Sequence, residues 1–347
     1  MPNEEEIKKA LEEVKYPGFT RNIVSFGMVK KIEVKDSTVD LVFGLTTSDK
    51  SVAEQIRADV EAALRKVAGI KTINLIINLQ AAKAQSGPSG IPGVRRVVAV
   101  ASGKGGVGKS TVAVNLALAL QQSGAKVGLL DCDIYGPSIP MMMGVHQRPQ
   151  ITGDKLEPLN NFGIRLMSMG FLIDEDSPVI WRGPMIMKTV QQFSHNVNWG
   201  ELDYLVIDLP PGTGDTQLSL CQTLPLDGVV MVTTPQEVAL IDVRKAAAMF
   251  LKVNVPILGI IENMSTFICP SDNKRYDIFG TGGGRKEAER TGVPFLGEIP
   301  ITLEIRQGGD QGLPVMVAAP GSVPGKAFAG LAAALRSQLE KPASRAE

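Results

Sequence analysis

The sequence of 347 residues contains little of what stabilises small secreted proteins or builds common metal sites. Its three cysteines, Cys132, Cys221 and Cys269, are too few and too widely spaced for a disulfide framework. Its two histidines have no second ligand at metal-binding spacing, and its two tryptophans show no pattern for stacking on nucleic-acid bases. These absences exclude a disulfide-stapled domain and a histidine-based metal site.

Excess charge and long apolar runs are also absent. Lys and Arg together number 36, as do Asp and Glu, so net charge gives no electrostatic reason to expect binding to nucleic acid or to an anionic membrane. The sequence begins with an acidic stretch, unlike a secretory signal, and no apolar run approaches the roughly 20 residues of a membrane-spanning helix. We therefore expect a cytoplasmic protein with reduced thiols and with neither nucleic acid nor a membrane as a partner.

The first 80 residues have the pattern of a small α+β domain. Apolar residues recur at helical spacing in 7–14 and again in 52–67, where Gly69 ends the helix. Residues 28–34 and 38–45 alternate apolar and polar side chains, which predicts a hairpin, and residues 73–77 alternate again. The predicted order over residues 1–80 is helix, strand, strand, helix, strand.

Two segments are unsuited to a packed element. Residues 81–95 include three glycines, two serines and two prolines within 85–93, a composition typical of a flexible linker. Residues 341–347, at the end of the chain, are expected to be disordered. The linker implies that the small domain is separate from a second, larger domain.

Residues 96–340 predict a mostly parallel, doubly wound α/β domain. Short continuous apolar runs alternate with helical segments, as in strands that are buried on both faces of a parallel sheet. The runs are 97–101, 127–130, 204–207, 229–232, 257–261 and 295–296. Near the C-terminus, an amphipathic helix with few cations is expected to dock on the sheet through Phe328, Leu331, Leu335 and Leu339.

A glycine-rich segment in this domain has the pattern G-x-x-x-x-G-K-[ST] of a phosphate-binding P-loop, between a predicted strand and an apolar helix at 112–120. Its glycines let backbone N–H groups turn toward phosphate oxygens, and the helix N-terminus adds its positive dipole end. Lys109 would reach the β- and γ-phosphates of ATP, and the Ser110 hydroxyl would ligate Mg²⁺. The residues predicted to bind nucleotide here are Gly103, Lys104, Gly105, Gly106, Val107, Gly108, Lys109, Ser110 and Thr111. The pattern therefore predicts a P-loop ATPase.

Carboxylates follow two further predicted strands. Asp131 and Asp133 lie at the carboxyl end of a strand, where ligands of open α/β sheets bind. Helix capping is the alternative interpretation of these two residues. Asp208 ends an apolar strand in the Walker B pattern, which holds Mg²⁺ through water, and the loop 210–215 is a candidate sensor of the γ-phosphate.

Several motifs resemble those of one family. The lysine at position 104 is similar to that of the deviant Walker A loop in MinD/ParA-like ATPases. The runs Asp-Cys-Asp-Ile-Tyr-Gly-Pro-Ser at 131–138, Asp-Leu-Pro-Pro-Gly-Thr-Gly-Asp at 208–215 and Glu-Asn-Met-Ser at 262–265 resemble the Mrp/ApbC family of ATP-dependent iron–sulfur cluster carriers. The N-terminal segment, with Gly-Met-Val at 27–29, resembles the metal–sulfur cluster assembly domain that often precedes this ATPase.

The resemblance implies a homodimer that binds ATP and Mg²⁺, hydrolyses ATP and passes clusters to iron–sulfur apoproteins, with assembly factors as further partners. It implies three catalytic residues: Lys104, which crosses the two-fold interface to the other subunit's phosphates, Lys109, and Asp133, which orients the attacking water. Asn263 matches the position that hydrogen-bonds adenine. ATP binding would close the dimer and hydrolysis would relax it, because both subunits neutralise the charge on the γ-phosphoryl group.

The chain departs from the family at the cluster-binding positions. Many members carry Cys-x-x-Cys after Asn-Met-Ser, whereas this chain has Cys269 followed three residues later by Asp272. Two subunits then supply two thiolates of Cys269 instead of four, so we expect a labile iron–sulfur cluster with Cys269 as a metal ligand. Cys132 and Cys221 are expected to be packing residues.

Two other functions stay open on the sequence alone. One is a MinD/ParA-type nucleotide-switched dimer in spatial organisation, which would need a basic surface or an amphipathic anchor. The other is a nucleotide-dependent interaction protein that binds no cluster.

Overall fold

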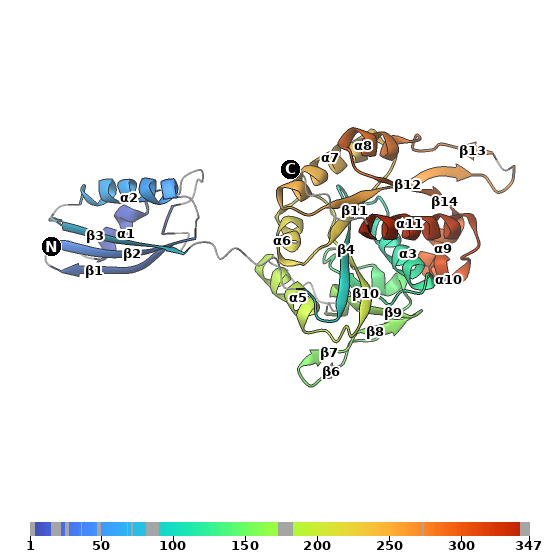
Figure 1. The fold of residues 1–347 in the computed structure, drawn as a ribbon, viewed down its shortest axis with the longest axis horizontal. Coiled ribbons are helices and arrows are strands. Elements are labelled where there is room, and N and C mark those ends of the chain that lie inside the picture. The colour runs from blue at the N-terminus through green and yellow to red at the C-terminus, as the bar shows by residue number, and fades with distance from the viewer. Residues whose placement is uncertain are drawn as a thin grey trace. The chain divides into compact units, whose positions relative to one another are not determined.

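The computed structural model describes residues 4–14, 22–24, 28–35, 37–46, 50–67, 69–70, 72–80, 90–172, 183–272 and 274–340. Within the chain there are two compact units, Met1–Gly87 and Pro88–Glu347, which we call the N-terminal and C-terminal units (Figure 1). Most of the predicted linker, residues 81–89, and the predicted disordered tail, residues 341–347, lie outside the described residues.

The N-terminal unit is a three-stranded sheet with two helices. Its elements are α1 (Glu4–Leu11), β1 (Val29–Lys35), β2 (Thr38–Thr46), α2 (Lys50–Leu64) and β3 (Thr72–Gln80). Strand β2 pairs antiparallel with β1 and parallel with β3. The apolar positions of the two helices face the inner side of β2, and the largest buried side chains include Ile7, Leu11, Phe43 and Leu64. The element order is the predicted one.

The C-terminal unit contains a nine-stranded, mostly parallel sheet. Its order is β13-β12-β11-β4-β10-β5-β9-β8, with β14 also paired to β12. The strands parallel to their neighbours are β4 (Val94–Ser102), β5 (Val127–Asp131), β9 (Ile164–Ser168), β10 (Leu202–Asp208), β11 (Gly228–Thr233), β12 (Ile257–Ile268) and β14 (Phe295–Ile301). The antiparallel edge strands are β8 (Leu159–Asn161) and β13 (Arg275–Tyr276), and β6 (Ile151–Thr152) with β7 (Lys155–Leu156) forms a separate ribbon.

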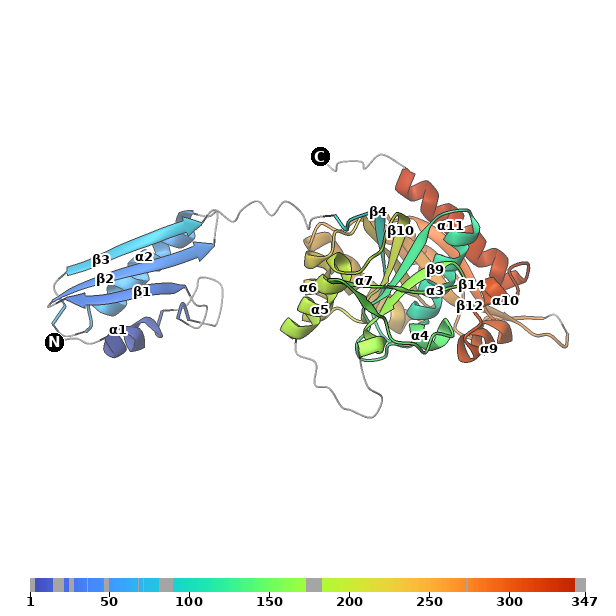
Figure 2. The same cartoon turned by 90° about the horizontal axis from the view of Figure 1, so that it is seen from below.

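Helices cover both faces of this sheet (Figure 2). On one face α3 (Lys109–Gln122) packs against α11 (Val323–Glu340), with α9 (Leu303–Gln311) and α10 (Val315–Ala318) beside them. On the other face lie α5 (Gly183–His195), α6 (Asp215–Thr223) and α7 (Glu237–Lys252), with α8 (Gly283–Thr291) against α7. Two short elements, α4 (Ile139–Met142) and the 3₁₀ helix η1 (Met169–Leu172), complete the unit. The predicted doubly wound fold is confirmed.

The strands and helices of the C-terminal unit that have continuous apolar runs in the sequence are largely buried. Strand β11 is buried along its whole length, and α3 buries its entire middle section because it lies between the sheet and α11. In α11, Phe328, Leu331 and Leu335 are buried against the rest of the unit, as predicted for docking on the sheet. Among the described residues, no helix is long and apolar enough to cross a membrane.

Several features differ from expectation, among them the short strands β6, β7, β8 and β13, which were not predicted. Ile91 is 2% exposed and β4 begins at Val94, so packed structure starts within the residues predicted as linker. Strand β9 was not predicted, because Arg165 interrupts its apolar run. Arg165 is accommodated by a hydrogen bond to the carbonyl oxygen of Trp199.

Candidate functional site

The phosphate-binding loop lies between the end of β4 and the start of α3. Gly106 and Gly108 have φ of +81° and +82°, a left-handed conformation that glycine adopts without strain. A Cβ added to Gly105 or Gly106 would have nothing within 4 Å, so these two glycines border open space. A Cβ at Gly103 would collide with the backbone of Asp242 in α7. The predicted loop therefore uses some glycines to leave a cradle and others to pack against the fold.

Lys109 lies at the centre of this site, with 6% of its surface exposed. Its Nζ donates to Asp208 Oδ1 over 2.6 Å and to Ser110 Oγ over 3.2 Å, and lies 3.4 Å from Asp133 Oδ2. Ser110 Oγ donates to Asp208 Oδ2 over 2.5 Å. These residues meet because β4, β10 and β5 are adjacent parallel strands whose carboxyl ends share one edge of the sheet.

Three carboxylates are buried at this edge. Burial raises the pKa of Asp131 to about 8, with the charge of Asp208 adding to the rise and a hydrogen bond from Ser168 opposing it. Burial also raises the pKa of Asp208, although Lys109 and Ser110 oppose the shift. Asp133 Oδ1 is buried and has no hydrogen-bond partner among the residues that the structure describes. A buried acceptor without a donor is costly, so this edge is suited to receive a ligand that donates a hydrogen bond.

The helix-capping interpretation of the acidic pair is wrong. Asp131 accepts hydrogen bonds from the backbone N–H of Asp133 and from Ser168 Oγ, and Asp133 Oδ2 faces Lys109. The nearby helix α4 has Ser138 at its N-cap. Ser168 was missed by sequence reasoning, because its position beside Asp131 depends on the register of the unpredicted strand β9.

Other predicted nucleotide-binding residues lie around the loop. Asn263 on β12 is 7% exposed, and its Nδ2 donates to the carbonyl oxygen of Val107 over 2.8 Å. A Cβ at Gly108 would collide with this amide group. Thr111 Oγ1 lies 4.0 Å from Met142 Sδ in α4. Lys104 is half-buried, and its ammonium group has no partner among the described residues. The roles of Asn263 toward adenine and of Lys104 across a dimer stay predictions.

Strands β12 and β13 form a hairpin at an edge of the sheet (Figure 1). Cys269 lies in its turn, directly after the end of β12. Its thiol is half-buried, and its Sγ lies 3.0 Å from Ser271 Oγ. The backbone N–H of Lys274 and a hydrogen bond from Cys269 lower the pKa of Asp272. Across the described part of the chain, no three or more His, Cys, Asp or Glu side chains are grouped to hold a metal ion. A single subunit therefore offers one thiol and one ionised carboxylate at this turn.

The two other cysteines are packing residues, as predicted. Cys132 and Cys221 are buried at 0% and 4% exposure. Burial raises the pKa of the Cys132 thiol well above its usual range and that of Cys221 to about 12. Both therefore remain protonated and are poor metal ligands.

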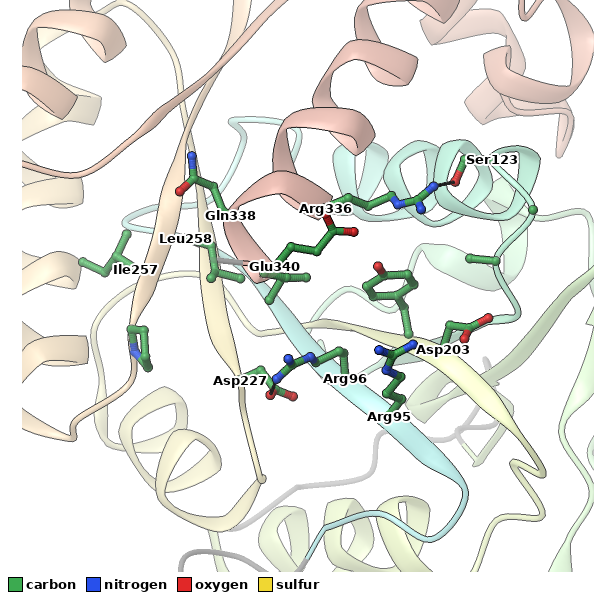
Figure 3. A pocket seen from close by; sticks show the side chains of 15 residues that line it. Arg95, Arg96, Ser123, Asp203, Asp227, Ile257, Leu258, Arg336, Gln338 and Glu340 are labelled. Atoms are coloured by element: carbon green, nitrogen blue, oxygen red, sulfur yellow. Dashed lines mark hydrogen bonds and ion pairs between the residues drawn. The ribbon is translucent and has the colours of Figure 1, made fainter. Parts of the chain in front are cut away.

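A large cavity, about 860 Å³, lies away from these residues (Figure 3). It is lined by the amino ends of β4, β10 and β12, by Asp227 just before β11, and by the C-terminal ends of α3 and α11, at the edge of the sheet opposite the P-loop. Arg96 is paired with Asp227 over 2.8 Å. The lining arginines, Arg95, Arg96 and Arg336, are balanced by Asp203, Asp227 and Glu340. None of the predicted site residues lies in this cavity, and its balanced charge indicates no ligand of either sign.

Comparison with known proteins agrees with both units. A profile described as an iron–sulfur cluster assembly protein matches residues 4–75, and one described as the NUBPL iron-transfer P-loop NTPase, a ParA-type family, matches residues 93–336. The iron–sulfur cluster carrier protein of Synechocystis sp. is 44% identical over 96% of this chain and 97% of its own length.

Solved structures agree as well. The nucleotide-binding protein of Archaeoglobus fulgidus, in complex with ADP, is 40% identical to this chain, with a TM-score of 0.58. The match covers 64% of this chain and 88% of that one. MinD of Pyrococcus horikoshii, complexed with Mg-ADP, is 25% identical to this chain, with a TM-score of 0.52. The match covers 69% of this chain and 94% of that one. The resemblance inferred from the motifs is confirmed: the chain belongs to the family of NUBPL iron-transfer P-loop NTPases and carries an iron–sulfur cluster assembly domain at its N-terminus.

Proposed function

We propose that this protein is an ATP-dependent carrier, which binds an iron–sulfur cluster as cargo and transfers it to apoproteins. The observation that supports it best is the course of β12. This strand holds Asn263 against the P-loop through Val107 and ends at Ile268, directly before Cys269 and its half-buried thiol. The nucleotide site and the candidate cargo site are therefore connected by one strand. The names of the relatives, iron–sulfur cluster carrier proteins, agree with this function.

Nucleotide binding follows from the geometry of the loop. Gly105 and Gly106 border open space beside the N-terminus of α3, where backbone N–H groups without intrahelical partners can bind phosphate oxygens. Lys109 would exchange its carboxylate contacts for contacts with the β- and γ-phosphates. The oxygens of Ser110 and Asp208 are hard ligands of the type Mg²⁺ prefers, and they lie 2.5 Å apart. Mg²⁺ bound there would neutralise phosphate charge.

Hydrolysis is assigned to Asp133. Its Oδ1 is a buried acceptor to which no described residue donates, so it can accept a hydrogen bond from a water molecule and orient that water. Its other oxygen, Oδ2, lies 3.4 Å from Lys109 Nζ, so the carboxyl group is beside the lysine that would bind the phosphates. The ammonium group of Lys104, which has no partner in the described part of the chain, would complete the site of a second copy in a homodimer.

The cargo site is incomplete in one subunit. Cys269 from two subunits gives two thiolates, and Asp272 oxygens or a client protein's cysteines would supply the remaining ligands. Carboxylate is a harder and less suitable ligand for such a cluster than thiolate. We therefore expect weak, oxygen-sensitive cluster binding, which suits a protein that gives its cluster away.

Anaerobic reconstitution with iron and sulfide tests this function, with iron per chain and the absorption spectrum as readouts. The unaltered protein should bind a cluster, Cys269→Ala should bind none, and Asp272→Cys should bind more. Cys221→Ala is the matched control, because that thiol is buried and stays protonated. A cluster content indifferent to Cys269→Ala would place the cargo elsewhere. No cluster under any anaerobic condition would contradict the carrier function and favour a cluster-free interaction protein.

A further inference from the structure

A buried hydrogen-bond network connects β9 to the backbone of Asp133. Asp131 ends β5 and Ser168 ends β9, the two are register partners, and neither is exposed to solvent. Ser168 Oγ donates to Asp131 Oδ2 over 2.8 Å, and the backbone N–H of Gly170 donates to Ser168 Oγ over 2.9 Å. The backbone N–H of Asp133 donates to the other oxygen, Asp131 Oδ1, over 3.0 Å. The carboxyl group of Asp131 thus joins Ser168 to Asp133.

Asp131 differs from the other two acidic residues because, within the described part of the chain, it makes no hydrogen bond or ion pair with the P-loop. The short contacts of Lys109 go to Asp208 and Asp133, whereas the hydrogen bonds of Asp131 come from Ser168 and from the backbone of Asp133. On its other side in the sheet, Asp131 pairs in register with Asp208, so two acidic side chains are neighbours. A buried carboxyl group beside another one depends on its hydrogen-bond donors to keep one orientation.

We propose that Ser168 is a positioning residue for ATP hydrolysis, which fixes the carboxyl group of Asp131 and, through it, the loop that carries Asp133. The proposal rests on the proposed function, in which Asp133 orients the attacking water. Without the Ser168 hydroxyl, Asp131 loses its side-chain donor and the backbone N–H of Asp133 loses a fixed acceptor. Asp133 would then shift relative to Lys109.

The expected loss is in turnover and not in nucleotide affinity. Ser168 Oγ donates to Asp131 and accepts from the backbone N–H of Gly170, and within the described residues its side chain makes no hydrogen bond to the loop 103–110. A displacement of about 1 Å in an orienting group costs up to about a hundredfold in rate. The backbone N–H of Cys132 also bonds to the carbonyl oxygen of Asp208, which limits the movement. We expect Ser168→Ala to lower kcat about tenfold, while KM for ATP and the Kd for ADP stay within about twofold.

The experiment compares four full-length proteins by steady-state ATP hydrolysis and by ADP titration. Ser168→Thr keeps the hydroxyl and should restore most of kcat. Ser194→Ala is the matched control, because Ser194 is 1% exposed and its hydroxyl bonds to backbone oxygens within α5, away from the site. It should leave both kcat and Kd unchanged. If Ser168→Ala does not fold, Ser168→Cys replaces it in the comparison, because the thiol is of similar size and is a weaker donor than the hydroxyl. This variant should also have a lower kcat than the unaltered protein.

Two results would overturn the proposal while leaving the proposed function intact: a kcat of Ser168→Ala within twofold of the unaltered protein, or a loss of kcat matched by an equal loss of ADP affinity. An equal loss in Ser194→Ala would also overturn it, since any buried hydroxyl would then have the same effect. Absence of ATP turnover in the unaltered protein would contradict the proposed function and this inference with it.

Discussion

At the scale of single residues, Lys109 lies between the side chains of Asp208 and Asp133. Asp208 ends β10, and Asp133 follows β5. The charge of Lys109 neutralises two buried acids and faces the phosphate cradle. Replacing Lys109 by Ala should lower ATP turnover by about 10²–10³-fold, and should weaken ADP binding by about ten- to a hundredfold because a charge-assisted hydrogen bond is lost.

Phosphate release and titration with a fluorescent ADP analogue measure these two effects. Lys126→Ala is a suitable control, because Lys126 is an exposed lysine at the opposite end of β5. Unchanged turnover in Lys109→Ala would refute the assignment of the P-loop as the hydrolytic site.

At the scale of elements, the P-loop glycines divide into two groups with different consequences. Gly105 borders open space, so Gly105→Ala should fold with an unchanged Tm and lose nucleotide affinity, because the methyl group occupies the cradle. Gly108 has φ +82° and no room beside Asn263. Gly108→Ala should therefore destabilise the protein itself, by about 1–2 kcal/mol from backbone conformation alone, which lowers Tm by several degrees.

Thermal unfolding monitored by circular dichroism separates the two variants, and ADP titration of Gly105→Ala completes the comparison. An equal Tm for both variants would show that the backbone at position 108 and the side chain of Asn263 can adjust to the added methyl group without loss of stability.

At the scale of the whole molecule, each unit has its own core. Buried side chains of the C-terminal unit begin at Ile91, and those of the N-terminal unit fall between Ile7 and Leu64. A fragment of residues 90–347 should therefore fold and hydrolyse ATP with a kcat within about twofold of the full chain, since its core and P-loop are intact. Circular dichroism and phosphate release check this. A fragment without cooperative unfolding would show that the two cores depend on each other.

Dimer closure is the second prediction at this scale. Lys104 is half-buried and without a partner among the described residues. Lys104→Ala should retain nucleotide binding within a few-fold and lose both hydrolysis and ATP-dependent dimerisation, if its ammonium group neutralises phosphate charge across the interface. Light scattering with and without ATP measures the mass. The same ATP-dependent mass and turnover as the unaltered protein would make Lys104 an ordinary loop residue.

Much of the fold and site was predictable because the signals are local. The order of elements follows from hydrophobic periodicity, and the P-loop is a contiguous run whose function depends on neighbours in the chain. Asp133 and Asp208 were predictable because each follows or ends an apolar strand, and the carboxyl ends of parallel strands share an edge. Strand β9 was not, since Arg165 breaks its apolar run and its place in the sheet depends on pairing with β5.

The sequence by itself thus determined the fold class, the P-loop, the acidic residues around it and the missing second cysteine. Only the tertiary structure decided which of these residues form hydrogen bonds and ion pairs with one another. Ser168 reaches Asp131 from 37 positions away, and Asn263 reaches Val107 from 156. No local pattern encodes such pairs, because the sheet's register and strand order bring them together. The same holds for Gly103, whose small size is required by the backbone of α7.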